Sequence, residues 1–268
     1  MSYIILTSRE REELSETFFR LRTIAQKNPL VMQEVQTALR CLKAVHSNAI
    51  EDKKVDRIFL QVMLHGAGVK EKSIMSQHYG NAHTELRGQE EMLRLMEVKA
   101  HRREPLSISL VQQMHHDIFR ESTPDFAGVF RSGDVRIKGM KHRPCHHSQI
   151  TQIFHQRLQS INEQLFDIEN IDAESFFRIL ALSAEAHYLV ACVHPFEDGN
   201  GRVARAVGDY VMLAHGFFYD VIMTDYRDVY LESMSESTLS NTTPLFRFIE
   251  FSYLETLKRI SGFFDILD

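Results

Sequence analysis

The sequence predicts an all-α protein, a helical bundle interrupted by one short β-hairpin. A chain of 268 residues with a hydrophobic fraction of 44% is long enough and apolar enough to bury a core. Apolar residues recur every three or four positions through most of the chain, which is the period of an amphipathic helix. Only one segment departs from that period and carries the signals of strands and a turn. Together these observations favour the all-α class.

The helices are predicted from this spacing, beginning with a single apolar stripe over residues 30–52. A second and more apolar pattern covers residues 173–193. Five further segments show the same spacing and are predicted to be helices: residues 85–101, 108–119, 148–165, 205–217 and 244–260. The irregular segment 65–85 predicts a boundary between an N-terminal helical region, residues 1–100, and a core domain, residues 101–268.

The departure from helical spacing is the segment GVFRSGDVRIKGMKHRP, residues 128–144. It contains a Gly-Asp turn signal between short runs with partial alternation. Val135 and Ile137 alternate there with charged residues. This pattern predicts a β-hairpin, or flap, within the helical protein.

Composition and charge exclude several classes. The formal net charge of −5 gives no chain-wide basic surface, so a nucleic acid is not an expected partner. Three scattered cysteines fit a reducing compartment better than a disulfide framework. The N-terminus lacks the pattern of a signal peptide, and no run of about 18 apolar residues predicts a membrane span. We expect a cytoplasmic protein, with delivery into a host cell as an effector left open.

The segment HPFEDGNGRVAR, residues 194–205, gathers unusual chemistry between two helical runs. His194 follows the first run, and its ordinary pKa of about 6.5 leaves much of it neutral near pH 7, as a general base requires. Asp198 offers a hard oxygen ligand suited to Mg²⁺, which keeps waters and binds substrate phosphates. The segment therefore holds a candidate base beside a candidate metal ligand.

The same segment also predicts a site for phosphate. Gly199, Asn200 and Gly201 can adopt backbone conformations that turn successive N–H groups toward an anion. The helix that follows favours negative charge at its N-terminus. Arg202 and Arg205 are three residues apart, so they share a face of that helix, and their guanidinium groups suit phosphate oxygens. These are the parts required for transfer chemistry on a nucleotide.

HPFEDGNGRVAR resembles the signature of the Fic family, His-Pro-Phe-x-Asp/Glu-Gly-Asn-Gly/Lys-Arg-x-x-Arg, at every specified position. The resemblance covers roughly residues 100 to 260 and implies the Fic-fold helical bundle. It also implies a protein adenylyltransferase, which transfers AMP from ATP to a Ser, Thr or Tyr hydroxyl of a target protein. Because phosphate-transferring relatives carry Lys where this chain has Gly201, AMP transfer is favoured. Phosphocholine or UMP transfer and a silent, regulatory Fic domain remain alternatives.

The resemblance implies a role for each residue of the signature. His194 would take the proton of the target hydroxyl, and Asp198 would hold Mg²⁺ between the α- and β-phosphates. Asn200 and the glycine N–H groups would hold the α-phosphate. Arg202 and Arg205 would bind the β- and γ-phosphates. Phe196 would point into the core and fix the loop, a structural role that is also the ordinary one for a phenylalanine.

Two further regions acquire roles from the resemblance. The flap would hold the target segment by adding a strand to it, with Ile137, Lys138, Gly139 and Met140 approaching nucleotide and target. Tyr230 resembles a family position beside the adenine. The target protein itself cannot be identified from the flap. A homodimer is a candidate assembly by the same resemblance.

A possible brake lies at the end of the first predicted helix, in SNAIED, residues 47–52. It resembles the family's inhibitory motif, Ser/Thr-x-x-x-Glu-Gly/Asn: Ser47 and Glu51 match, and Asp52 replaces Gly or Asn. Residues four apart lie on one helix face. Glu51 would pair with Arg205 and withhold it from the γ-phosphate. A tenfold suppression requires about 1.4 kcal/mol, which one charge-assisted pair can supply. Removal of AMP by water with help from Glu51 is a secondary hypothesis.

The segment KHRPCHHS places four zinc-capable side chains close together, but their spacing matches no standard structural zinc site. These side chains are His142, Cys145, His146 and His147. We interpret the segment as an exposed polar loop at the far end of the flap. The sequence alone therefore predicts no metal site there.

Overall fold

The structure is a computed structural model that describes residues 4–51, 82–137 and 143–265, and every statement about the fold refers to these ranges. Its α-helices are α1 (Ser8–Lys27), α2 (Pro29–Glu51), α5 (Ala82–His101), α6 (Ile108–Phe119), α7 (Ile150–Asp167), α8 (Ala173–Val193), α9 (Asn200–Leu213), α10 (Arg227–Glu236) and α11 (Thr243–Asp265). Two short 3₁₀ helices lie at His147–Gln149 and Thr224–Tyr226. The all-α class is confirmed.

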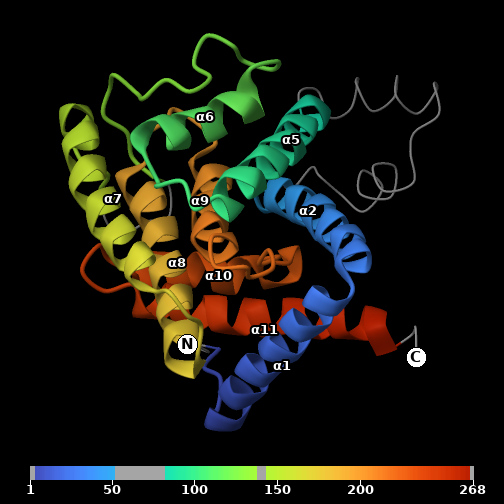
Figure 1. The fold of residues 1–268 in the computed structure, drawn as a ribbon. Helices are drawn as coiled ribbons and strands as arrows, with labels where there is room; N and C mark the ends of the chain where they lie inside the picture. Colours follow the sequence, from blue (N-terminus) through green and yellow to red (C-terminus); the bar gives the residue numbers. More distant parts are fainter. Residues whose placement is uncertain (1–3, 52–81, 138–142, 266–268) are drawn as a thin grey trace, which may run out of the picture.

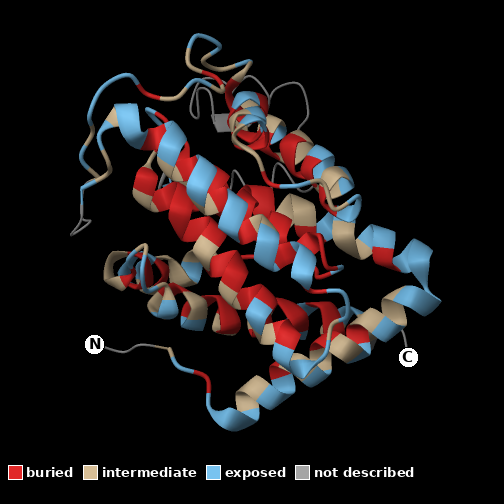
Figure 2. Ribbon diagram, turned by 60° about the vertical axis from the view of Figure 1, so that its left-hand side comes forward, coloured by how far each residue is buried: buried red, intermediate tan, exposed pale blue. Residues whose placement is uncertain are grey.

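α8 is the central helix, packed against α7, α9 and α11 (Figure 1). Its middle is buried on nearly every side, and Figure 2 shows it as a largely red element within the bundle. It is also the one helix in the described ranges that is long and apolar enough to cross a membrane, with a mean hydropathy of 1.5. Because 67% of that apolar window is buried within the fold, its composition is accounted for by its place in the core.

α1 was not among the predicted helices, although its sequence carries a clear start signal. Thr7 accepts a hydrogen bond from the backbone of Glu10, and the Glu10 side chain accepts one from the backbone of Thr7, which forms a capping box. Leu14, Phe18 and Leu21 then provide the buried face. Charged residues around these three positions interrupt the apolar pattern of the sequence, although the three apolar side chains themselves are fully buried. The short helix α10 was likewise missed.

An aromatic cluster joins α1 to the rest of the molecule. The ring of Phe18 lies 4.3 Å from that of Phe217 and 5.0 Å from that of Phe176 on α8, measured between centroids. Tyr253 of α11 completes the cluster. The N-terminal helix therefore shares its core with residues beyond 101. The predicted division near residue 100, which would fall at the end of α5, stays a prediction, and most of segment 65–85 lies outside the described ranges.

The expected hairpin is not confirmed. Residues 129–137 follow an irregular path without a strand, and residues 143–146 do the same on the return. The tip of the predicted flap, residues 138–142, lies outside the described ranges. Arg131 links the two described arms of the predicted flap, residues 129–137 and 143–146. Its guanidinium donates to the backbone carbonyls of Gly133 and Cys145, both at 2.6 Å. Side-chain hydrogen bonds thus take the place of the expected ladder.

Candidate active site

His194 ends α8 in the left-handed conformation, with φ 53° and ψ 60°, which turns the chain sharply out of the helix. The buried Arg131 fixes this turn by donating from Nε to the carbonyl oxygen of His194 at 2.8 Å. On the half-buried imidazole, Nδ1 lies 3.3 Å from the carbonyl oxygen of Ala191. Because a carbonyl can only accept, Nδ1 carries the proton and Nε2 is left as the basic nitrogen. Burial lowers the pKa of His194, which favours this neutral form.

Asn200 braces the loop that follows. Its Oδ1 accepts from the backbone N–H of Phe196 at 2.9 Å, and its Nδ2 donates to the carbonyl of Phe196 at 2.8 Å. With both polar atoms used and 3% of the residue exposed, Asn200 positions the loop through its side chain. The predicted contact of Asn200 with a phosphate would therefore have to come from its backbone N–H. Phe196 is fully buried, in the structural role expected of it.

His115 is a positioning residue that the sequence did not single out for function. Its ring stacks on Phe196 with 3.9 Å between centroids. Nδ1 accepts from the backbone N–H of Gly128 at 2.8 Å, so Nε2 donates to the carbonyl of Asp198 at 3.1 Å. Burial lowers the pKa of His115 to about 4, which keeps the ring neutral and preserves both bonds. His115 thus ties the start of the flap to the loop.

Gly199 and Gly201 open the N-terminus of α9 to an anion. Gly199 has φ +74°, and a Cβ there would lie 2.2 Å from the ring of Phe119, so no other residue fits. A Cβ on Gly201 would lie 2.0 Å from Oε1 of Glu51. The Glu51 carboxylate therefore rests directly on the first turn of α9. That position is where the helix dipole and free N–H groups favour negative charge.

Arg205 is held by residues of α2. Its Nε donates to Oγ of Ser47 at 2.8 Å, and its Nη2 donates to the carbonyl of Ser47 at 2.8 Å and to Oε1 of Glu51 at 2.7 Å. Burial alone would raise the pKa of the Glu51 carboxyl. The charge and hydrogen bond of Arg205, together with the charges of Arg202 and Arg227, hold that pKa below its ordinary value. The predicted pairing of Glu51 with Arg205 is present, and Ser47, predicted to share the helix face of Glu51, also contacts Arg205.

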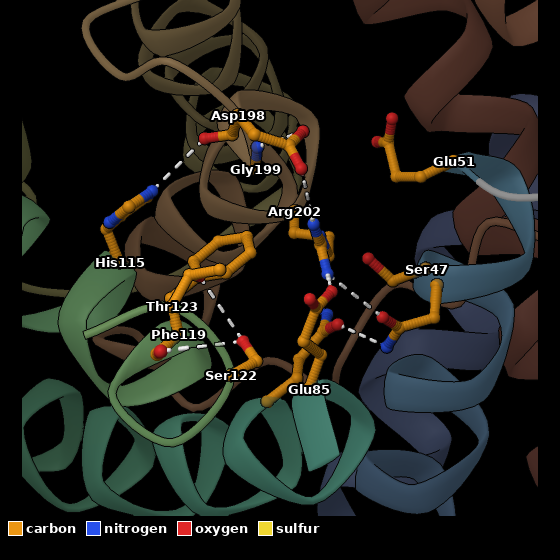
Figure 3. Close-up of polar contacts among 12 residues, drawn as sticks. Ser47, Glu51, Glu85, His115, Phe119, Ser122, Thr123, Asp198, Gly199 and Arg202 are labelled. Atoms are coloured by element: carbon orange, nitrogen blue, oxygen red, sulfur yellow. Dashed lines mark hydrogen bonds and ion pairs between the residues drawn. The ribbon is translucent and has the colours of Figure 1, made fainter. Parts of the chain in front are cut away.

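Arg202 is held by residues that sequence reasoning missed. Its Nη1 pairs with the carboxylate of Glu85 on α5 and lies 3.3 Å from Oδ1 of Asn48 on α2. Its Nη2 lies 3.6 Å from Oδ2 of Asp198, and its guanidinium lies over the ring of Phe119. Figure 3 shows Arg202 between Asp198 on one side and Glu85 on the other. Both arginines of the signature are thus paired with carboxylates from the N-terminal helices.

Asp198 points outward, with 73% of its side chain exposed. Its Oδ1 accepts from the N–H of Gly199 at 2.6 Å, which orients the carboxylate over the start of α9. A single exposed carboxylate beside an anion site fits Mg²⁺, which prefers one or two carboxylates completed by waters and substrate phosphates. The donor set on this loop is therefore compatible with the predicted ion.

The remaining predicted residues are less accessible. Tyr230 is 2% exposed, and its hydroxyl shares a hydrogen bond of 2.8 Å with Nε2 of His187. Its ring lies beneath the guanidinium of Arg205. Tyr230 therefore offers almost no free surface in this arrangement. Its predicted contact with adenine stays a prediction. Ile137 is half-buried on the described arm of the flap. The other predicted flap residues, Lys138, Gly139 and Met140, lie outside the described ranges.

α2 is fixed against α9 by a buried ion pair one turn before Ser47. Nζ of Lys43 lies 2.6 Å from Oδ2 of Asp209, and both side chains are at most 3% exposed. Residues 43, 47 and 51 follow one face of α2, and they meet residues 209, 205 and 201 of α9 in reverse order. The two helices therefore run antiparallel, and Lys43 sets the register that brings Glu51 to Gly201.

Lys43→Met is expected to lower the free energy of unfolding by about 3–5 kcal/mol, because it leaves the Asp209 carboxyl buried without its counter-ion. Burial already raises the pKa of Asp209 despite Lys43. Urea unfolding measures the loss. The double variant Lys43→Met/Asp209→Leu should recover most of the stability, and equal losses in the single and double variants would contradict this account.

Comparisons with known proteins find a family match over part of the chain. The model of the Fic/DOC family matches residues 105–212, which contain α6 to α8, the whole signature loop and all but the last residue of α9. Protein adenylyltransferase fic-1 of Caenorhabditis elegans is 27% identical over 185 residues, covering 67% of this chain and 34% of the relative. Protein adenylyltransferase Fic of Nematostella vectensis is 24% identical over 206 residues, covering 76% and 44%. The chain thus spans between a third and a half of the length of these relatives.

Solved structures support the fold. A Fic domain containing signaling protein from Bacteroides thetaiotaomicron superposes with a TM-score of 0.72 at 16% identity, covering 93% of this chain and 95% of that one. A fragment of Fic-1 from Caenorhabditis elegans gives 0.69 at 20% identity, covering 97% and 74%. At these identities the likeness concerns the fold. Residues 105–212, which include the signature loop, thus match the Fic/DOC family, and the chain has the fold of these solved Fic-domain structures.

Proposed function

We propose that the chain is a protein adenylyltransferase, which transfers AMP from ATP to a Ser, Thr or Tyr hydroxyl of a target protein and is held inactive by α2. One observation carries the proposal: a neutral histidine with a basic Nε2 stands at one end of a short loop, and the other end opens into the N-terminus of α9 with two buried arginines. The names of the matched relatives agree with this activity.

The proposed reaction uses groups that the loop already orients. Nε2 of His194 accepts the proton of the target hydroxyl as its oxygen attacks the α-phosphorus of ATP. The new oxygen–phosphorus bond forms while the bond from the α-phosphorus to the bridging oxygen breaks, and pyrophosphate leaves with that electron pair. The N–H groups of α9, with Arg202 and Arg205, offset the negative charge of the phosphates. Mg²⁺, held by Asp198, would neutralise further phosphate charge.

The contacts of α2 and α5 support autoinhibition. Arg205 is a buried charge, which is costly unless an anion accompanies it. Glu51 supplies that anion in the structure, and a phosphate of ATP would supply it during the reaction. The two anions compete for one guanidinium and for the same first turn of α9. Glu85 pairs with Arg202 and competes with phosphate for it in the same way. We therefore propose that productive binding exchanges two carboxylates for phosphate oxygens.

The activity is tested by incubating the Glu51→Gly variant with a lysate and ATP labelled either at the α- or at the γ-phosphate. We expect label on protein from the α-labelled nucleotide alone, because AMP keeps only that phosphate. Label from γ-labelled ATP would indicate phosphate transfer, and label from UTP or a phosphocholine donor would indicate another donor. No transfer from any donor would favour the silent, regulatory Fic domain.

Three finer proposals stay predictions. The Glu51 carboxylate lies on the first turn of α9, so it could also orient water for removing AMP from a modified target. Incubating a pre-labelled target with the native chain and with Glu51→Gln measures that reversal directly. A homodimer, and a cytoplasmic or host-cell location, rest on the family resemblance and the sequence composition.

A further inference from the structure

A second cluster of ligating side chains lies at the base of the flap, away from the phosphate site. Nδ1 of His147 lies 3.1 Å from Oδ1 of Asp134, and Nε2 of His146 lies 3.7 Å from Oδ2 of the same carboxylate. One ligand atom from each of these residues can be chosen so that all three lie within 4.8 Å of one another. The cluster joins the outgoing arm of the flap to its return.

The local fold holds these three side chains in place. The backbone N–H of His147 donates to Oδ1 of Asp134 at 3.0 Å, which aligns the two arms independently of the ring. Nδ1 of His146 lies 2.8 Å from Oγ of Ser148. The same Nδ1 accepts from the backbone N–H of Ser148 at 3.3 Å, so Ser148 holds the His146 ring through two contacts. The 3₁₀ turn at His147–Gln149 leads directly into α7, so the histidines stand on a helical support.

The spacing suits a small divalent transition-metal ion. Four ligands at the usual zinc distances of 2.0–2.1 Å are separated by about 3.3 Å in a tetrahedron. The distances of His147 Nδ1 from Oδ1 and of His146 Nε2 from Oδ2 of Asp134, 3.1 and 3.7 Å, lie on either side of that value, and one ligand atom from each residue lies within 4.8 Å of the others. Two imidazoles with one carboxylate favour Zn²⁺ or Co²⁺ over Mg²⁺, which prefers oxygen ligands. All three side chains reach solvent, between 35% and 57% exposed, so an ion has access and water can complete the coordination.

We propose that Asp134, His146 and His147 form a binding site for one zinc-type divalent ion, which joins the two arms of the flap at their base. This proposal differs from the interpretation of KHRPCHHS from sequence alone, which predicted no metal site there. The partner that completes the site is Asp134, twelve residues before His146. Cys145 is not part of the cluster, and His142 lies outside the described ranges.

The site connects to the catalytic loop through Arg131. Nη1 of Arg131 lies 3.6 Å from Oδ1 of Asp134, while its Nε donates to the carbonyl of His194. The ion would therefore fix the flap arms on the same guanidinium that fixes the turn at His194. This site is distinct from the proposed Mg²⁺ position at Asp198, which takes its remaining ligands from the substrate.

The test uses the full chain, stripped of metal by a chelator and titrated with Co²⁺ while its visible absorption is recorded. We expect one Co²⁺ per chain with the bands of a four-coordinate ion, displaced by an equivalent of Zn²⁺. Asp134→Asn, His146→Ala and His147→Ala should each weaken Co²⁺ binding by about tenfold or more. Circular dichroism establishes that each variant keeps its helices, as expected for exposed loop positions.

Matched control variants define the results that would overturn the proposal. His155→Ala removes an exposed histidine from the next helix, and Cys145→Ser removes the nearest thiol; both should bind Co²⁺ like the native chain. The proposal is overturned if the native chain binds no Co²⁺. Unchanged binding in the double variant His146→Ala/His147→Ala, or loss of binding in Cys145→Ser, would overturn it equally.

Discussion

Replacing His194 with alanine should reduce AMP incorporation by about 10²–10⁴-fold, the usual contribution of a positioned general base. The reason is the orientation of the imidazole: Nδ1 faces the carbonyl of Ala191, and the basic Nε2 is left for a hydroxyl. The measurement is incorporation of α-labelled ATP in the Glu51→Gly background, where the activity is high enough to show a large loss.

The fold and nucleotide binding should survive this substitution, because the phosphate contacts come from α9 and its arginines. His155→Ala, on the exposed face of α7, is the matched control and should keep full activity. Thermal unfolding and ATP binding distinguish a lost base from a damaged loop. Full activity in His194→Ala would defeat the assignment of the base.

Glu51→Gly should raise auto-modification by about tenfold or more, since removing about 1.4 kcal/mol of bias is enough for a tenfold change. The carboxylate that rests on Gly201 and pairs with Arg205 is then gone, and the anion site at α9 is free for a phosphate. Glu51→Gln separates charge from shape, because it keeps the size of the side chain and loses its negative charge. We expect its activity to lie between those of the native chain and Glu51→Gly.

Glu34→Gly is the matched control for the backbone effect of glycine. Glu34 lies on the same helix, is exposed, and precedes Glu51 by more than four helical turns. It should leave auto-modification at the native level even if α2 becomes less stable. Activation by Glu34→Gly equal to that of Glu51→Gly would show that loosening α2, and not releasing Arg205, removes the brake.

The sequence was informative where function is encoded by contiguous residues. The signature loop, the helix that follows it and the face shared by Ser47 and Glu51 were all predicted, because backbone conformation and helical spacing act over a few residues. The pairing of Glu51 with Arg205 followed from family resemblance, and the structure has it at 2.7 Å. Local rules were sufficient for these features.

The remaining features depend on packing between distant segments. Glu85 reaches Arg202 from a helix 117 residues earlier, and nothing in the local pattern around Glu85 marks it. In sequence, His115 has the pattern of an ordinary helical histidine. Only the fold places its ring between the N–H of Gly128 and the carbonyl of Asp198. Asp134 lies near His146 only because the return arm of the flap passes beside the outgoing arm. In each case the partner is chosen by tertiary contact, which helical or strand periodicity does not specify.

The most direct test of the account is a crystal structure of Glu51→Gly bound to Mg²⁺ and an ATP analogue whose bond between the α- and β-phosphates cannot break. The account predicts phosphate oxygens on the N-terminus of α9 and on Arg205, in the place of the Glu51 carboxylate, with the α-phosphorus facing Nε2 of His194. A triphosphate bound away from α9, or an imidazole turned from the α-phosphorus, would contradict both the catalytic assignment and the brake.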